Sequence, residues 1–535
     1  MSFRDIERSF FDLYWHLDPV AATQAGVSGH DDRYGRYSKA ALAPHLSALK
    51  SLASALEETA VDELEEEIDR TALLNEIRVM LRRFEKIRPQ ATNPEFWLSH
   101  LLGGLHHLLL SADRTPADKA LAAIGRLEDI PPFLDDIRAT LEEPVRVFVE
   151  TAVRMTEGGR VLIKDLAAQL GSQAPMHAAR LSAAAEEAQQ ALQKFDTNLA
   201  RWLEMGSEHF AIGEDDFNFL LHYQHALRDT APELWRYGLH LKHEVEQDLV
   251  RLATRLDGRP WPELVDTLRG DHPSPAELVD AYAKEMARAR DFVAHKALAP
   301  IPEAPLDVIP TPDFMRAVIP YAAYDSPGAY SRDRTGWFYV TVPDPRLPQA
   351  QQERILRDHC RYELAATALH EGYPGHHLQL VIAKEQASHV RKNLWTPLTV
   401  EGWALYCEDM MGEEGFYASD QELFFQRVHL LWRAMRILLD VGLHTRGMTR
   451  DEAVNQMVSE LHVERSNAEA EVRRYCAWPA YQLCYAVGRR ELLRLRDDFR
   501  QAKGKDFTLR GFHDAVLPYG GLPVSLIRWG LGLGE

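Results

Sequence analysis

Apolar residues recur every three or four positions along most of the chain, and this spacing constrains the fold more than any other feature. Leu46, Leu49, Leu52 and Leu56 illustrate it. The spacing places apolar side chains on one face of an α-helix, which a globular protein buries against other helices. The pattern lacks strands alternating with helices, which argues against a doubly wound α/β fold. We therefore predict a mainly α fold, a large helical body with a deep cleft.

Several long helices are predicted in the first half of the chain, over residues 117–130, 142–158, 178–204 and 232–256. Proline ends or kinks a helix, so Pro131 and Pro132 are expected to end the first of them. We find no internal repeat and no low-complexity linker. The sequence therefore predicts a single domain over residues 1–535.

Residues 300–350 differ in character from the rest. Prolines cluster between positions 300 and 312, and residues 336–343 are rich in aromatic and β-branched side chains, which predicts a strand. Residues 314–319 are expected to pair with that strand. A small β-sheet, at about 314–343, is therefore expected next to the helix that carries the candidate metal ligands.

Composition and charge exclude several classes of protein. The formal net charge of −19 argues against nucleic acid or an anionic membrane as the main partner. There is no run of 18 apolar residues, and the start of the chain lacks the basic and apolar regions of a signal peptide. The four cysteines show no CxxC pairing, which is typical of reduced thiols. We expect a cytoplasmic protein and leave open a homodimer.

The stretch from Ala365 to Gln379 predicts a metal site. An apolar helical run ends in His370 and Glu371. Zinc peptidases place two histidines at i and i+4 with a glutamate after the first, because i+4 returns to the same helix face. Here position i+4 is Pro374. On an unbroken helix His377, at i+7, would lie roughly 10 Å further along the axis. That is too far for one ion with bonds of about 2.0–2.1 Å to nitrogen.

Pro374 removes this difficulty, because its ring clashes with the carbonyl of His370, while Gly375 tolerates the resulting backbone. A bulge that absorbs two residues makes a spacing of six equivalent to four and selects His376 as the second ligand. A bulge of three residues would select His377. We favour His376.

Glu401 is the candidate third ligand. It lies 25 residues after His376, enough for one helix, a turn and the start of a second helix. Two histidines, one carboxylate and an open fourth position form a catalytic zinc site. We predict one Zn²⁺ per chain, held by His370, His376 and Glu401, with Glu371 as the general base that activates a water. The alternative is a core histidine at 370 and a surface acid at 401.

The strings HEGYPGHHLQ, at 370–379, and EGWALY, at 401–406, resemble the signature HExxPGHHxQ…EGWAxY of a bacterial family of unknown function. That family resembles the gluzincin metallopeptidases, above all the helical thermostable-type zinc carboxypeptidases. Those enzymes carry HExGH, so this chain departs from them by two inserted residues. The resemblance is specific from about Tyr321 onward. It implies a zinc metallopeptidase of carboxypeptidase type that hydrolyses short peptides.

The resemblance extends to the tyrosine-rich segment 481–488, which completes a metal-site region of about 360–490. Tyr485 is expected to donate a hydrogen bond to the oxygen that gains charge during hydrolysis. Tyr481, at i,i+4 on the same predicted helix face, is expected to bind substrate. Glu408, seven residues after Glu401, is expected to orient a ligand histidine.

A carboxypeptidase also needs a cation for the terminal carboxylate of its substrate. Arg436, in an apolar run, is expected to supply it, because the guanidinium group binds a carboxylate through two parallel hydrogen bonds. The alternative is a structural pair with Asp440 at i,i+4. Arg433 lies in the same apolar run as Arg436, and Arg473 and Arg474 are rival clamps.

Other histidines carry weaker signals. His100, His106 and His107 lack a suitably spaced carboxylate. His222 and His225 are spaced i,i+3, but nothing nearby completes a ligand set, and a hydrogen-bonded structural role is favoured.

Two other functions remain open. One is a metal-dependent amide or ester hydrolase with a non-peptide substrate, which substrate profiling would distinguish. The other is a helical binding protein whose metal is structural or absent. A structural zinc site is closed by four protein ligands, so the number of ligands separates this last function from catalysis.

Overall fold

The computed structural model describes residues 2–111, 113–312, 316, 319 and 321–534. The chain is 72% helical with one small sheet, which confirms the predicted mainly α fold. It divides into two compact units. Unit 1 comprises residues 1–210 and 327–333, and unit 2 comprises residues 211–326 and 334–535. The deep cleft stays a prediction. So does the single domain, because compactness does not test whether the two units fold together.

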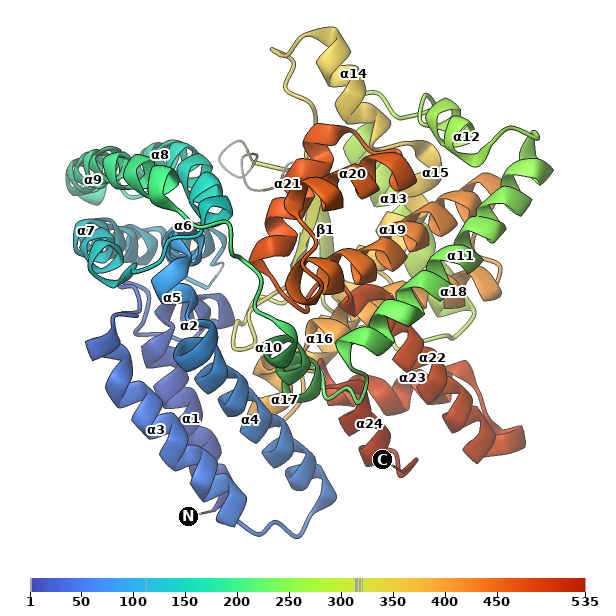
Figure 1. Cartoon of the computed structure of the whole chain (residues 1–535), viewed down its shortest axis with the longest axis horizontal. Coiled ribbons are helices and arrows are strands. Elements are labelled where there is room, and N and C mark those ends of the chain that lie inside the picture. The colour runs from blue at the N-terminus through green and yellow to red at the C-terminus, as the bar shows by residue number, and fades with distance from the viewer. Residues whose placement is uncertain (1, 112, 313–315, 317–318, 320, 535) are drawn as a thin grey trace. The chain divides into compact units, whose positions relative to one another are not determined.

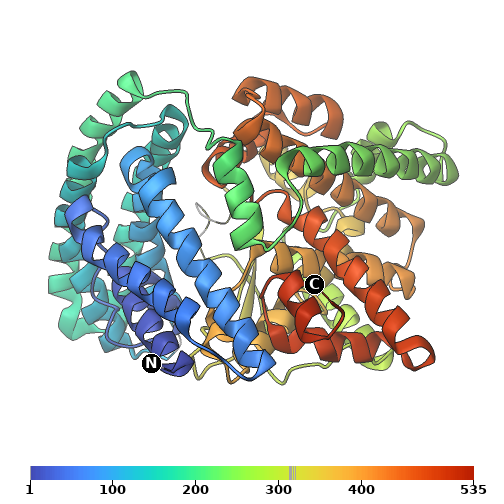
Figure 2. The same cartoon turned by 60° about the horizontal axis from the view of Figure 1, so that its bottom comes forward.

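Unit 1 is built from helices, coloured blue to green in Figures 1 and 2. Its α-helices are α1 (Phe3–Leu17), α2 (Pro19–Ala25), α3 (Lys39–Glu58), α4 (Leu64–Arg82), α5 (Pro89–Thr92), α6 (Pro94–Leu110), α7 (Pro116–Thr140), α8 (Arg146–Gln173) and α9 (Ala178–Met205). A π-helical turn, η1 (Arg83–Ile87), follows α4, and a 3₁₀ turn, η2 (Pro175–His177), precedes α9. The helices predicted over 117–130, 142–158 and 178–204 correspond to α7, α8 and α9.

The predicted helix end at Pro131 and Pro132 is wrong, because α7 continues through both prolines. Each proline in a helix interior costs about 3 kcal/mol. Four fully buried apolar side chains surround the two prolines along α7: Ile130, Phe133, Leu134 and Ile137. Each contributes about 1.5–3 kcal/mol by leaving water. Burial of this apolar face therefore offsets the lost hydrogen bonds.

Unit 2 contains the remaining helices and the sheet. Its helices are α10 (Glu214–Phe219), the π-helical turn η3 (Leu220–Gln224), α11 (Ala231–Leu256), α12 (Trp261–Leu268), α13 (Leu278–His295), α14 (Gln349–Arg357), α15 (Arg361–Glu371), α16 (His376–Lys384), α17 (His389–Asn393), α18 (Pro397–Glu413), α19 (Asp420–Thr445), α20 (Arg450–Leu461), α21 (Arg465–Ala477), α22 (Cys484–Lys503), the 3₁₀ turns η5 (Gly504–Asp506) and η6 (Leu517–Tyr519), α23 (Leu509–Val516) and α24 (Val524–Gly530). The helix predicted over 232–256 corresponds to α11.

The sheet has three strands in the order β1 (Leu306–Pro310), β3 (Gly336–Val340), β2 (Ala322–Asp325). β1 runs parallel to β3, and β2 runs antiparallel to it. Phe338 and Val340 of β3 share a buried cluster with Leu364 and Ala368 of α15. The predicted sheet beside the candidate metal helix is therefore confirmed, and the strand predicted at 336–343 is β3. The strand predicted at 314–319 lies, except for residues 316 and 319, outside the described residues.

No helix in the described part of the chain has both the length and the apolar character needed to span a bilayer.

Candidate metal centre

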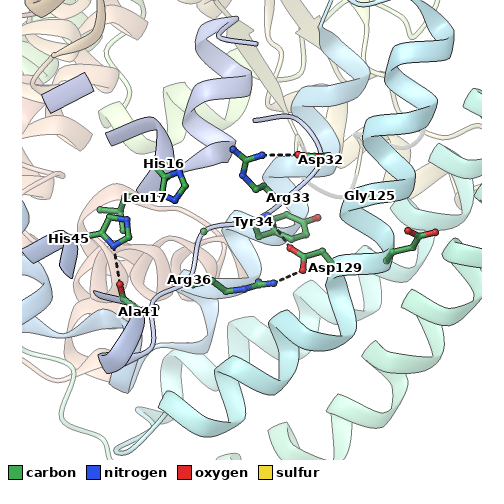
Figure 3. Close-up of a pocket in the computed structure, with 12 residues that line it drawn as sticks. His16, Leu17, Asp32, Arg33, Tyr34, Arg36, Ala41, His45, Gly125 and Asp129 are labelled. Atoms are coloured by element: carbon green, nitrogen blue, oxygen red, sulfur yellow. Dashed lines mark hydrogen bonds and ion pairs between the residues drawn. The ribbon is translucent and has the colours of Figure 1, made fainter. Parts of the chain in front are cut away.

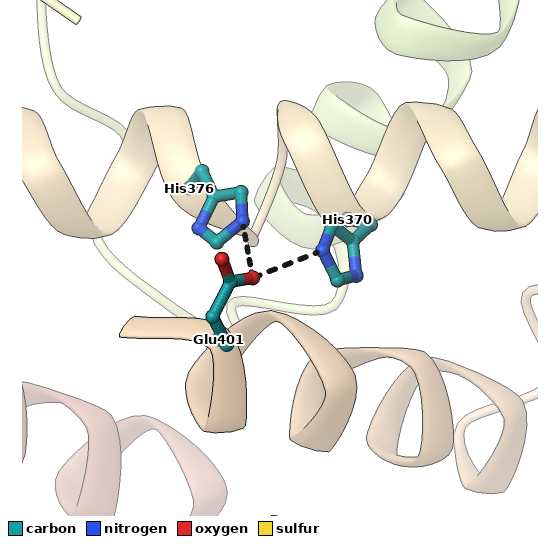
Figure 4. A group of neighbouring side chains, drawn as sticks. All are labelled: His370, His376 and Glu401. Atoms are coloured by element: carbon teal, nitrogen blue, oxygen red, sulfur yellow. Dashed lines mark ion pairs between the residues drawn. The ribbon is translucent and has the colours of Figure 1, made fainter. Parts of the chain in front are cut away.

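The two histidines of the motif lie at facing ends of two helices. His370 is in the last turn of α15, and His376 is the first residue of α16. Residues 372–375, which include a cis peptide bond between Tyr373 and Pro374, separate the two helices. The predicted two-residue bulge within one helix is therefore wrong, because the motif spans two separate helices. The break nevertheless brings His376, rather than His377, toward His370 (Figure 4).

Gly375 is required where α16 begins. A Cβ at this position would lie 1.9 Å from the carbonyl oxygen of His370 and 2.4 Å from that of Leu369. The amide of Gly375 donates to the Leu369 oxygen at 3.0 Å. A side chain would thus push the two helix ends apart. The glycine of the motif sets the separation of the two histidines.

α18 fixes the turn between the two helices from a third direction. The indole Nε1 of Trp403, which is fully buried, donates to the carbonyl oxygen of Pro374 at 2.8 Å. Glu401 lies two residues earlier on the same helix. The tryptophan of the Glu-Gly-Trp motif therefore connects the turn between α15 and α16 to the helix that carries the candidate third ligand.

α18 packs closely on α22 through two glycines. A Cβ on Gly402 would lie 2.5 Å from the carbonyl carbon of Gly488, and a Cβ on Gly488 would lie 1.8 Å from the carbonyl oxygen of Leu398. Only glycine at both positions allows this approach. The contact places Glu401, next to Gly402, beside the turn that precedes α22.

His370, His376 and Glu401 converge on one point. The Nε2 atoms of His376 and His370 lie 3.4 Å and 3.9 Å from Oε2 of Glu401 (Figure 4). Two ligand atoms at about 2.0–2.1 Å from a tetrahedral ion lie about 3.3 Å apart. All three side chains are buried. Within the described residues, this is the one group of three or more histidine, cysteine or carboxylate side chains close enough to share an ion.

A second carboxylate orients His370. Nδ1 of His370 lies 2.8 Å from Oε1 of Glu408, whose side chain is 1% exposed. A carboxylate only accepts here, so Nδ1 carries the proton, and Nε2 offers its lone pair toward Glu401 when the ring is neutral. The expected role of Glu408 beside a ligand histidine agrees with this contact.

The charges of the site fit a cation. Burial opposes protonation of His370, but the adjacent carboxylates of Glu401 and Glu408 outweigh burial and raise its pKa to about 9. Burial also opposes ionisation of Glu401, yet the adjacent imidazoles of His370 and His376 hold its pKa well below the usual range. Without a metal, the buried carboxylates thus depend on a proton held by an imidazole. A divalent cation would replace that proton, so the residues present fit a metal such as zinc.

His377 faces away from this point. Its Nε2 lies 3.2 Å from the carbonyl oxygen of Ala304 and must donate to it, because a carbonyl only accepts. Its Nδ1, 3.0 Å from the hydroxyl of Tyr324, then accepts from that hydroxyl. Both ring nitrogens are occupied, and the alternative in which His377 is a ligand receives no support.

Glu371 and Tyr481 lie next to the candidate ligands. Glu371 is the last residue of α15, follows His370 directly and is half-buried. The hydroxyl of Tyr481 donates to Oε1 of Glu401 at 2.8 Å. The predicted helix face shared by Tyr481 and Tyr485 is wrong, because α22 begins at Cys484 and Tyr481 lies in the turn before it. Their rings are 6.4 Å apart.

Arg436 is paired within the protein. Its Nη2 donates to Glu471 at 3.1 Å and its Nε to the hydroxyl of Tyr475 at 3.0 Å. Its guanidinium lies 4.7 Å from the ring centre of Tyr485. The alternative pair with Asp440 is not formed, because Asp440 accepts backbone N–H groups of residues 480 and 483. The role of Arg436 in substrate binding stays a prediction.

A separate pocket, with a volume of about 620 Å³, lies in unit 1 (Figure 3). Charged side chains that line it pair with one another: Arg33 with Asp32 at 3.1 Å, and Arg36 with Asp129. None of the predicted site residues lines this pocket. It is therefore separate from the candidate metal ligands.

Comparisons with known proteins concern nearly the whole chain. The profile of a family described as "Bacterial protein of unknown function (DUF885)" matches residues 19–530. A solved structure described as a "putative lipoprotein of unknown function" from Shewanella oneidensis has a TM-score of 0.81 at 23% identity and covers 99% of both chains. Another, a "putative lipoprotein" from Colwellia psychrerythraea, has a TM-score of 0.85 at 18% identity and covers 99% of this chain and 98% of its own. At such identities these comparisons show a common fold and nothing further. No curated protein gives a comparable match.

Proposed function

This chain belongs to the bacterial DUF885 family, whose description assigns no function, and from its metal centre we propose that it is a zinc-dependent hydrolase, most specifically a peptidase that cleaves short peptides. The observation that carries the proposal is the convergence of His370, His376 and Glu401 at distances that suit one ion. Three protein ligands leave a fourth position open, which is typical of catalytic rather than structural zinc sites.

The chain's own residues account for the steps of peptide hydrolysis. A bound zinc ion would polarise a substrate carbonyl and lower the pKa of a neighbouring water. Glu371 would take a proton from that water as oxygen attacks the carbonyl carbon. It would then give the proton to the leaving nitrogen as the amide bond breaks. A tyrosine hydroxyl would donate to the carbonyl oxygen while it carries negative charge.

Two tyrosines compete for that last role. Tyr485 is the residue indicated by the resemblance to helical zinc carboxypeptidases. Tyr481 is the one whose hydroxyl lies on a candidate ligand, Glu401. We retain Tyr485 as the proposed oxyanion donor and Tyr481 as the group next to bound substrate. Separate phenylalanine variants distinguish them.

Carboxypeptidase specificity is proposed on the resemblance to gluzincins alone. It requires a cation for the substrate's terminal carboxylate, and Arg436 remains the proposed group, with Glu471 as its resident counter-ion. The peptide substrate, the cytoplasmic location and the homodimer stay predictions.

The proposal is tested by the metal content of the purified protein, measured by elemental analysis. We expect one equivalent of zinc in the wild type and loss of zinc in His376→Ala. His377→Ala is the matched control, because it removes a neighbouring buried histidine whose nitrogens face elsewhere, and it should retain the metal. A wild type that takes up no zinc when supplied with it would overturn the proposal.

Activity on a library of short peptides then tests the catalytic step. Glu371→Gln should retain zinc and lose peptide hydrolysis, since the amide cannot accept the proton. Full activity in Glu371→Gln would exclude Glu371 as the general base. If the protein hydrolyses esters or non-peptide amides and not peptides, the metal-dependent hydrolase proposal is kept and the peptide substrate is excluded.

A further inference from the structure

A buried histidine outside the metal centre connects the two elements that meet at Glu401. His225 directly follows the turn η3 and is fully buried. Its Nδ1 lies 2.6 Å from the hydroxyl of Thr396, at the start of α18. Its Nε2 lies 2.9 Å from the carbonyl oxygen of Ala480, in the turn that carries Tyr481.

The direction of each hydrogen bond is fixed by chemistry. A carbonyl only accepts, so Nε2 of His225 donates to Ala480. Burial lowers the pKa of His225 to about 4, which keeps the ring neutral, and Nδ1 therefore accepts from the hydroxyl of Thr396. The same hydroxyl accepts from the amide of Leu398, as the N-cap of α18. Every donor and acceptor of the bridge is used.

The far end of the bridge has an unusual backbone. Ala480 has φ of +60°, in the left-handed region that residues other than glycine rarely adopt. Asp440, which is fully buried, holds this turn from the other side by accepting the amides of Ala480 at 3.1 Å and Leu483 at 3.2 Å. Ala480, the residue before Tyr481, is thus held at its amide nitrogen by Asp440 and at its carbonyl oxygen by His225 and by the Cys484 thiol, which donates to the same oxygen at 3.3 Å.

These contacts connect the start of α18 to Glu401 by a second route, through His225 and the turn of Tyr481. Thr396 begins α18, Glu401 lies in the second turn of that helix, and the hydroxyl of Tyr481 donates to Glu401 at 2.8 Å. We propose that His225 is a positioning residue of the metal centre, which holds the turn of Tyr481 at a fixed distance from α18 and so orients the carboxylate of Glu401. The structural part of this inference concerns the hydrogen bond between Tyr481 and Glu401. Its effect on metal affinity rests on the proposed function.

His513 supplies a matched control. It is also fully buried, and its ring contacts one hydroxyl, that of Tyr406 at 2.8 Å, and one carbonyl, that of Leu298 at 2.7 Å. His225→Ala and His513→Ala therefore remove the same chemistry from the core. Only the first breaks the link between Thr396 and the turn of Tyr481.

The first experiment needs no metal. Amide hydrogen exchange is compared in the zinc-free wild type, His225→Ala and His513→Ala. Loss of the bridge should speed exchange about tenfold in peptides covering residues 480–484, the size expected for one net hydrogen bond. His513→Ala should leave those peptides unchanged. Equal exchange in His225→Ala and wild type would overturn the structural part. If His225→Ala fails to fold, Thr396→Val removes the same bridge from its other end.

The second experiment is a double-mutant cycle in zinc affinity. Tyr481→Phe and His225→Ala are expected to weaken zinc binding by similar factors, about 3–10-fold each, and the double variant should bind no more weakly than the weaker single variant. His225→Gln, whose amide can still donate to Ala480, should recover part of the loss. Multiplicative losses in the double variant would overturn the positioning role. A wild type without zinc would overturn the proposed function instead, and hydrogen exchange would still decide the structural part.

Discussion

Replacing Glu408 should weaken zinc binding without abolishing the fold. Its Oε1 accepts from Nδ1 of His370 at 2.8 Å in a site where the carboxylate is 1% exposed. Glu408→Gln keeps an acceptor and loses the charge, whereas Glu408→Ala leaves Nδ1 without a partner. Changes of this kind behind a ligand histidine cost about 10–100-fold in affinity, or about 1.4–2.7 kcal/mol. We therefore expect about 10-fold for the glutamine variant and about 100-fold for the alanine variant.

The assay is competition for zinc against a chromophoric chelator of known affinity. Glu414→Gln is the control, because it removes the same charge at the C-terminal end of α18, roughly 20 Å along the axis from Glu401. It should bind zinc as the wild type does. If Glu408→Gln and Glu408→Ala also match the wild type, Glu408 does not act on the metal through His370, and the reasoning fails.

Three further predictions concern the same centre. Gly375→Ala, whose Cβ would lie 1.9 Å from the oxygen of His370, should lose zinc and at least about 3 kcal/mol of stability in denaturant melts, whereas Gly103→Ala, with no atom within 4 Å, should gain up to about 1 kcal/mol. Equal unfolding free energies for Gly375→Ala and the wild type would contradict this prediction. Both Tyr481→Phe and Tyr485→Phe are assayed at saturating zinc, because the first is also expected to weaken zinc binding; the variant that lowers kcat identifies the oxyanion donor, and two fully active variants would exclude both. In the zinc-free protein, burial opposes protonation of His370, but two adjacent carboxylates outweigh burial and raise its pKa to about 9. The resulting stability is complete below about pH 6.5 and falls by about 3 kcal/mol as pH rises through 9, so unfolding free energies independent of pH over this range would count against it.

The candidate ligands could be identified from the sequence because their spacing is constrained by helix geometry. The need for two nitrogens at one ion excluded one continuous helix, Pro374 indicated where it breaks, and a two-residue bulge was favoured, which selected His376 over His377. The structure brings His370, His376 and Glu401 together as expected. The form of the break could not be predicted, since it depends on Trp403 of α18 reaching the carbonyl of Pro374.

Residues governed by tertiary packing were predicted less well. Pro131 and Pro132 lie inside a helix because the side chains around them are buried. The rule that proline ends a helix considers only the local backbone and not the free energy of burying those side chains. Tyr481 was expected on a helix, but Asp440, forty residues earlier in the chain, stabilises a turn there. The alternative pair of Arg436 with Asp440 is replaced by a pair with Glu471 of a different helix, and the substrate role of Arg436 stays a prediction. For Tyr481 and Arg436 the deciding contact is distant in sequence.

The division of the motif between two helices has a consequence for how metal and folding are linked. A single helix carrying two ligand histidines presents them as soon as it is helical. Here the histidines belong to α15 and α16, and their separation depends on α18. An isolated peptide over residues 361–384 should therefore have little affinity for zinc. Metal uptake then becomes a property of the folded unit, so that saturating zinc should raise its unfolding temperature, and the rate at which a chelator strips the metal should report how often α15, α16 and α18 separate.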